Sequence, residues 1–186
     1  ASGGKPSGKF RLIGTRDWRS PGVELNDLGY LYQADYISED IVMIYRVNKP
    51  NKILLNYYID LSQEYLWSYG GEKLNSELQA HGRVQLKNMW RVDLVGRGNF
   101  FEMDTRQLRG GPSLRIDGNT STQFFLQTNT SKDLFMGAGT YFSRNDDKIS
   151  KSNQYTFHIE YLIGNRFSLS SNTEYGTTTN NNQYVM

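Results

Sequence analysis

The chain has only two histidines, and they are its best candidates for acid–base chemistry or metal binding. Glu160 follows His158 by two residues, and Glu77 precedes His81 by four. In a β-strand, residues two or four apart share a face, so each pair could in principle bind a metal or transfer a proton. No third ligand with usable spacing is visible. We therefore expect structural roles for both, and no enzyme activity, metal or cofactor.

A second candidate is the Gly-rich stretch Asp104–Thr120, in which Arg109 is followed by Gly-Gly-Pro. A guanidinium beside flexible backbone could bind a carboxylate or sugar hydroxyls. The alternative is a folded loop whose glycines adopt positive φ and whose arginine pairs with nearby carboxylates. We favour this structural interpretation.

The polar and aromatic residues around Arg19–Asp35 could bind a sugar by stacking and hydrogen bonding. Such residues more often hold a loop in place through Asx-type turns, which is again the interpretation we favour. Together the two stretches supply the candidate ligand-binding residues Trp18, Glu24, Asn26, Asp27, Arg106, Arg109 and Arg115.

The elements that would position these loops are strands, because apolar and polar residues alternate through three runs between Lys52 and Met103. One face of these runs is apolar: Ile53, Leu55, Tyr57, Ile59 and Leu61, then Leu74, Leu78, Ala80, Val84 and Leu86, then Trp90, Val92, Leu94, Gly96 and Phe100. Each run is roughly 12 to 16 residues long, against about five or six in soluble proteins. At about 3.3 Å per residue and a tilt of roughly 40°, such a strand crosses a bilayer. We expect the apolar face to meet lipid and the polar face to line a lumen.

The composition is compatible with this interpretation. No window approaches 18 uninterrupted apolar residues, which excludes a helical membrane protein, whereas a β-barrel needs only every second residue to be apolar. A net charge of +2 with scattered Lys and Arg argues against a nucleic-acid partner. The absence of cysteine excludes disulfides and thiolate sites.

Similar alternation elsewhere gives about nine full strands and the beginning of a tenth at Gln183–Met186. Residues 1–8 are read as a flexible entry, and Asn145–Asn153 as a mobile loop. Short turns alternate with mostly longer loops, as in outer-membrane barrels. The chain is therefore read as one barrel domain, or an incomplete fragment of one, whose remaining strands follow residue 186 or come from a partner. Aromatic residues expected at the membrane interfaces are Trp18, Trp67, Tyr69, Trp90, Phe101, Tyr141 and Tyr175.

Charged residues on the polar faces of the strands are expected to form cross-strand ladders. The cations are Arg83, Lys87, Arg91 and Arg97, and the carboxylates are Glu77 and Asp93.

The stretches WRSPGVELNDLGYLYQAD, from Trp18 to Asp35, and DTRQLRGGPSLR, from Asp104 to Arg115, resemble two motifs of a family of Gram-negative outer-membrane proteins of unknown function. The resemblance implies a large C-terminal β-barrel, which in that family usually follows an N-terminal carbohydrate-binding domain similar to family 9 modules. That domain and the last expected strands are missing from this sequence.

The sequence thus predicts an all-β, antiparallel, meandering transmembrane β-barrel segment of about nine to ten strands in the cell outer membrane. We expect a porin-like wall of a pore or receptor whose lumen and external loops bind or admit a polar solute, such as one derived from a glycan. Its expected partners are the lipid bilayer and either other outer-membrane proteins or the remainder of the barrel. The alternatives are a soluble β-barrel that binds a ligand in its interior, and an outer-membrane enzyme with its site at the loop rim.

Overall fold

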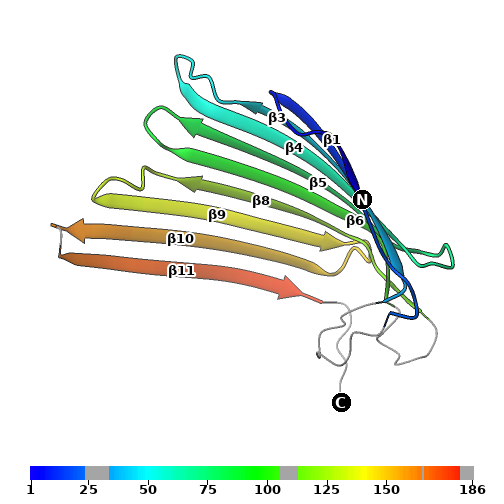
Figure 1. Cartoon of the computed structure of the whole chain (residues 1–186). Helices are drawn as coiled ribbons and strands as arrows, with labels where there is room; N and C mark the ends of the chain where they lie inside the picture. Colours follow the sequence, from blue (N-terminus) through cyan, green and yellow to red (C-terminus); the bar gives the residue numbers. More distant parts are fainter. Residues whose placement is uncertain (24–33, 105–112, 165, 181–186) are drawn as a thin grey trace.

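Long antiparallel strands, each paired with the next, make up nearly all of the computed structural model, which describes residues 1–23, 34–104, 113–164 and 166–180 (Figure 1). The strands form one sheet in the order β1-β2-β3-β4-β5-β6-β8-β9-β10-β11, and the short β7 pairs with the end of β6 beside β8. Their bounds are β1 Ser2–Lys5, β2 Phe10–Arg19, β3 Tyr36–Val47, β4 Leu54–Trp67, β5 Lys73–Leu86, β6 Arg91–Asp104, β7 Leu114–Ile116, β8 Asn119–Gln127, β9 Leu134–Asn145, β10 Lys151–Ile163 and β11 Phe167–Thr179.

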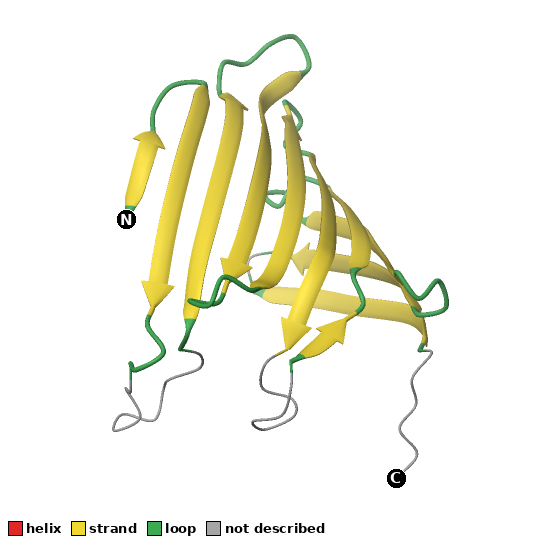
Figure 2. Cartoon of the chain, turned by 90° about the vertical axis from the view of Figure 1, so that its right-hand side faces the viewer, coloured by secondary structure: helices red, strands yellow, loops and turns green. Residues whose placement is uncertain are grey.

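The sheet is open. Within the described ranges β1 and β11 lie at opposite edges and do not pair with each other. Figure 2 shows how far the strand direction turns between the edge that holds the N-terminus and the edge that leads to the C-terminus, as the right-handed twist of strands requires. The predicted all-β antiparallel meander is therefore confirmed, with eleven strands among the described residues rather than nine or ten, and these residues do not close a barrel by themselves.

The cross-strand register sorts the side chains onto two faces of different character, because directly paired residues point the same way. The row through the middle of one face, here called the apolar face, is Leu12, Met43, Leu61, Ala80, Gly96, Thr122 and Phe142. On the opposite side, here called the polar face, one row is Arg46, Tyr58, Arg83 and Asp93.

The apolar face is the more exposed of the two. Ile41, Ile59 and Leu94, all well inside their strands, are 48%, 57% and 52% exposed. The only hydrophobic side chain buried among the described residues is Leu74. The structure exposes 13,513 Å², whereas a globular protein of this mass exposes about 9,100 Å². The apolar side chains therefore do not converge on a dry core.

Three breaks in the register interrupt the alternation that the sequence shows. Leu55, Leu74 and Phe100 are each skipped in the pairing of their strands with a neighbour. A bulge of this kind sets two residues opposite one and shifts the faces beyond it. This is why Leu74 is not exposed on the apolar face beside Leu78 but is buried, in a hollow that it shares with residues that include Asp35 and Ser68.

Two segments that the sequence predicts to be irregular are ordered. Residues 2–5 of the predicted flexible entry form β1, in which Gly4 has a φ of 146°. A Cβ at Gly4 would lie 2.1 Å from the carbonyl oxygen of Leu12, so the close approach of β1 to β2 requires glycine here. The predicted mobile loop Asn145–Asn153 is a short turn, in which Asp147 accepts hydrogen bonds from the backbone of Ile149 and Ser150.

The expected long loops agree only in part with the structure. Within Asp104–Thr120, β7 and the start of β8 are strand. Most of Arg19–Asp35 and the predicted last strand at Gln183–Met186 lie outside the described residues. None of the described segments is a helix of the length and apolarity that a membrane-crossing helix needs.

Candidate functional site

The structure does not bring the sequence-predicted ligand-binding residues together within its described part. Glu24, Asn26, Asp27, Arg106 and Arg109 lie outside the described residues. The other two lie on the apolar face. Trp18, at the end of β2, is 54% exposed and is paired with Ile37. Arg115, in β7, lies over the ring of Phe101, with its guanidinium carbon 5.6 Å from the ring centroid.

His158 has a local role in the sheet. Its Nδ1 lies within hydrogen-bond distance of Asn172 Oδ1 on β11, and its Nε2 is 3.8 Å from Glu160. The ring of Phe135 lies beside it, with 5.3 Å between the centroids. Beside the imidazole, these neighbours supply one carboxylate and one side-chain amide oxygen. More generally, the described residues contain no group of three or more His, Cys, Asp or Glu side chains able to hold a metal ion.

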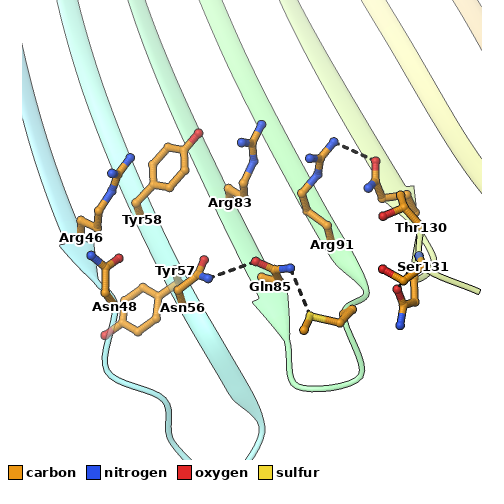
Figure 3. A pocket seen from close by; sticks show the side chains of 13 residues that line it. Arg46, Asn48, Asn56, Tyr57, Tyr58, Arg83, Gln85, Arg91, Thr130 and Ser131 are labelled. Atoms are coloured by element: carbon orange, nitrogen blue, oxygen red, sulfur yellow. Dashed lines mark hydrogen bonds between the residues drawn. The ribbon is translucent and has the colours of Figure 1, made fainter.

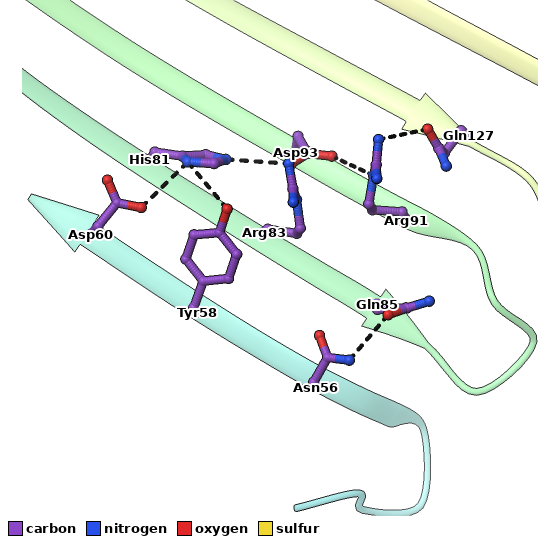
Figure 4. Close-up of polar contacts among 9 residues, drawn as sticks. All are labelled: Asn56, Tyr58, Asp60, His81, Arg83, Gln85, Arg91, Asp93 and Gln127. Atoms are coloured by element: carbon purple, nitrogen blue, oxygen red, sulfur yellow. Dashed lines mark hydrogen bonds and ion pairs between the residues drawn. The ribbon is translucent and has the colours of Figure 1, made fainter. Parts of the chain in front are cut away.

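His81 lies at the centre of a network that spans three strands (Figure 4). Its Nδ1 is 3.3 Å from Asp60 on β4, and its Nε2 is 3.3 Å from Asp93 on β6. The hydroxyl of Tyr58 lies 3.5 Å from the same Nδ1. An imidazolium can donate to both carboxylates, whereas a neutral ring can donate to one of them only. The side chains of His81, Asp60 and Asp93 are between 12% and 19% exposed, so this part of the polar face is well shielded.

The partners of His81 are not those that its own strand suggests. Glu77, four residues earlier on β5, pairs instead with Arg97 on β6 at 3.1 Å. Residues four apart in a strand are separated by about 13 Å, whereas directly paired residues on adjacent strands lie about 5 Å apart. The pairing of Asp60 with His81 therefore decides the contact, and it depends on a register that no single strand reveals.

Asp93 is shared by two arginines. Arg83, its direct partner across β5 and β6, forms a short ion pair with Oδ1 of Asp93, and Nε of Arg91 lies 3.0 Å from Oδ2. Nη2 of Arg91 donates to Oε1 of Gln127 on β8 at 2.7 Å. Together with the Arg97–Glu77 pair, these contacts confirm the predicted cross-strand charge ladder. Its expected member Lys87 instead lies exposed in the turn between β5 and β6.

A hollow of about 500 Å³ opens beside this network, close to the turns that follow β3, β5 and β8 (Figure 3). Three arginines line it: Arg46, Arg83 and Arg91. The ring of Tyr58 lies between two of them, because β4 runs between β3 and β5. The guanidinium carbons of Arg46 and Arg83 are 5.0 Å and 5.5 Å from the ring centroid. The rest of the lining is mostly amides and hydroxyls: Asn48, Asn56, Gln85, Gln127, Asn129, Thr130 and Ser131, together with Met89 and with Tyr57, which the register places on the apolar face.

Sequence reasoning does not find this hollow. Arg46 and Tyr58 carry no motif, and they become neighbours of Arg83 only through the pairing of three strands. The sequence does indicate the face of Tyr58. This residue lies two positions from both Asn56 and Asp60, so the three share the polar face of β4.

The comparisons with known proteins give one match. A family model with the description "Domain of unknown function (DUF5916)" matches residues 1–186, which is the whole chain. The match says nothing of a barrel or of a carbohydrate-binding domain. No curated protein matches the chain, and no solved structure does.

Proposed function

We propose that this chain, which belongs to the DUF5916 family of domains of unknown function, forms part of the wall of an outer-membrane β-barrel. In this proposal the apolar face meets lipid, and the polar face lines a lumen that binds or admits a polar solute. The observation that carries the proposal is the exposure of apolar side chains in the middle of long strands. Water disfavours such a surface, whereas a bilayer accommodates it.

The length of the apolar surface along β4 fits a bilayer. Tyr57 and Trp67 lie near the two ends of this strand on the apolar face. Ten residues at about 3.3 Å each give about 33 Å along the strand, or about 25 Å along the membrane normal for a tilt near 40°. The outward apolar band of an outer-membrane barrel is about 25 Å tall.

Aromatic contacts on the apolar face lie toward the strand ends, where interfacial residues would be needed. Tyr57 contacts Tyr45 near one end of β4, and Trp67 contacts Tyr65 near the other, each with 6.3 Å between centroids. Of the aromatic residues predicted for these bands, Tyr141 is an exception. It pairs with Gln123 and Gln154 on the polar face, and the neighbouring Phe142 lies on the apolar face instead.

A matched pair of substitutions at neighbouring positions tests the proposal. Leu61→Arg places a charge near the middle of the apolar face, which costs about 2 to 4 kcal/mol at the bilayer midplane. Ser62→Arg places the same charge on the polar face, between Asp60 and Glu64 of the same strand. We expect Leu61→Arg to reduce strongly the fraction of intact protein that inserts into lipid vesicles, and Ser62→Arg to leave it nearly unchanged. Equal insertion of the two variants, or a wild-type protein that stays folded and dispersed without detergent, would remove the membrane assignment.

A further inference from the structure

The hollow beside Tyr58 carries more positive than negative charge. Arg46, Arg83 and Arg91 line it, while the ion pairs of these arginines within the described residues all go to one carboxylate, that of Asp93. Three permanent positive charges thus face one negative charge, because a guanidinium stays protonated at any pH that the protein experiences.

Hydrogen-bond donors also outnumber acceptors here. Each guanidinium presents five N–H groups, and a carboxylate offers about four lone-pair sites. Although Arg91 Nε lies 3.0 Å from Asp93 Oδ2, neither atom has a hydrogen bond of good geometry within the described part of the chain. Side-chain amides of Asn56, Gln85 and Gln127 also line the hollow; Asn56 Nδ2 donates to Gln85 Oε1, and Gln127 Oε1 accepts from Arg91.

Arg46 is held in position and remains free to bind. Its guanidinium lies over Tyr58, and among the described residues it has no ion pair. Stacking on an aromatic ring fixes the plane of a guanidinium while its edge N–H groups remain available to an acceptor. A planar fork of this kind suits bidentate recognition of a carboxylate or phosphate group.

We propose that this hollow is a binding site for the oxyanion group of a polar solute, a carboxylate or a phosphate, contacted by Arg46 together with Arg83 and Arg91. The inference rests on the proposed function in taking the polar face as the one that meets solutes, and it names their chemical class. Binding itself requires no bilayer, so the two proposals can fail separately.

The test is calorimetric titration of the intact protein in a neutral detergent with inorganic phosphate and with glucuronate, and with glucose as the uncharged comparator. We expect at least one of the two anions to bind and glucose not to bind. Arg46→Gln should weaken anion binding about tenfold or more, since it removes a charged hydrogen-bond donor.

The matched control is Arg97→Gln, which removes the same charge from the same face at the middle of β6, about 20 Å along the strand from Arg91, where Arg97 is paired with Glu77. It should change the affinity less than about twofold, because charges separated by more than the Debye length, about 8 Å at physiological salt, are largely screened. Arg46→Gln breaks no ion pair of the described residues, and far-ultraviolet circular dichroism checks that it folds.

Binding of neither anion, or equal weakening by Arg46→Gln and Arg97→Gln, would overturn the site. Binding of phosphate alone or of glucuronate alone would support it and identify the oxyanion. Anion binding by a protein that does not insert into vesicles would overturn the membrane assignment only, and insertion without anion binding would overturn the site only.

Discussion

The charge of Asp93 is expected to stabilise the middle of the sheet. Asp93→Asn keeps the size of the side chain and removes the charge that Arg83, Arg91 and His81 share. A hydrogen bond to a charged group contributes about 1.5 to 3 kcal/mol. Because Asn retains one acceptor and the two arginine side chains, each 35% exposed, can be hydrated, we expect a net loss of about 2 kcal/mol rather than the sum.

Urea unfolding of the intact protein, followed by tryptophan fluorescence, measures this loss. With a slope of about 1 to 3 kcal/mol per molar urea, the midpoint should fall by about 1 M. Asp133→Asn is the matched control, since Asp133 lies exposed in the turn before β9 and only its backbone carbonyl has a described contact. It should leave the free energy of unfolding within about 0.5 kcal/mol of wild type.

A double-mutant cycle separates the ion pair from general effects of charge. Arg83→Gln alone should also destabilise, but when it is combined with Asp93→Asn the two losses should not add, with a coupling free energy of about 1 kcal/mol. Additive losses, or a shift for Asp93→Asn no larger than that for Asp133→Asn, would refute the view that the shared carboxylate stabilises this network.

Two further predictions concern the turn before β10 and the glycines of the sheet. The side-chain hydrogen bond from Ser150, followed by backbone hydrogen bonds, lowers the pKa of Asp147 below its usual range. The stabilisation that these hydrogen bonds to the Asp147 carboxylate give the folded protein is therefore complete above the ordinary aspartate pKa. It is lost as the pH falls through the lowered pKa. Ser150→Ala should raise the titration midpoint of Asp147 in carbon-detected NMR, and an unchanged midpoint would contradict the assignment. Gly139→Val should lower the free energy of unfolding by about 1 to 3 kcal/mol, because a Cβ there would lie 2.7 Å from Thr156 Oγ1. Gly82→Val, in open space, should be nearly neutral, and equal losses for the two would show that crowding is not the cause.

Alternation along single strands was enough to predict an all-β antiparallel meander and most of the face assignments. The runs between Lys52 and Met103 became β4, β5 and β6, because a period of two is a local property of an extended chain. The sequence of a single strand does not determine its register with the neighbouring strands. The bulge at Leu74 therefore could not be predicted, nor could the contact of His81 with Asp60.

Composition was a weaker guide than alternation. The two glycines and the serine of residues 2–5 indicated a flexible segment, but a strand that approaches its neighbour this closely needs glycine at the point of contact. The candidate binding site could not be derived for a related reason. Arg46, Tyr58 and Arg83 belong to three different strands, and none of them is unusual in its own sequence context.

The meander order has a consequence for how the sheet assembles. Every long strand pairs with its predecessor in sequence, so most pairings close only a short loop and lose little chain entropy. A β-sheet of this topology has a low contact order for its size, which favours fast hairpin-by-hairpin growth. The two largest closures are β2 to β3, across residues 20–35, and β6 to β8, across residues 105–118. Folding kinetics should therefore place the slowest pairing steps at these two junctions.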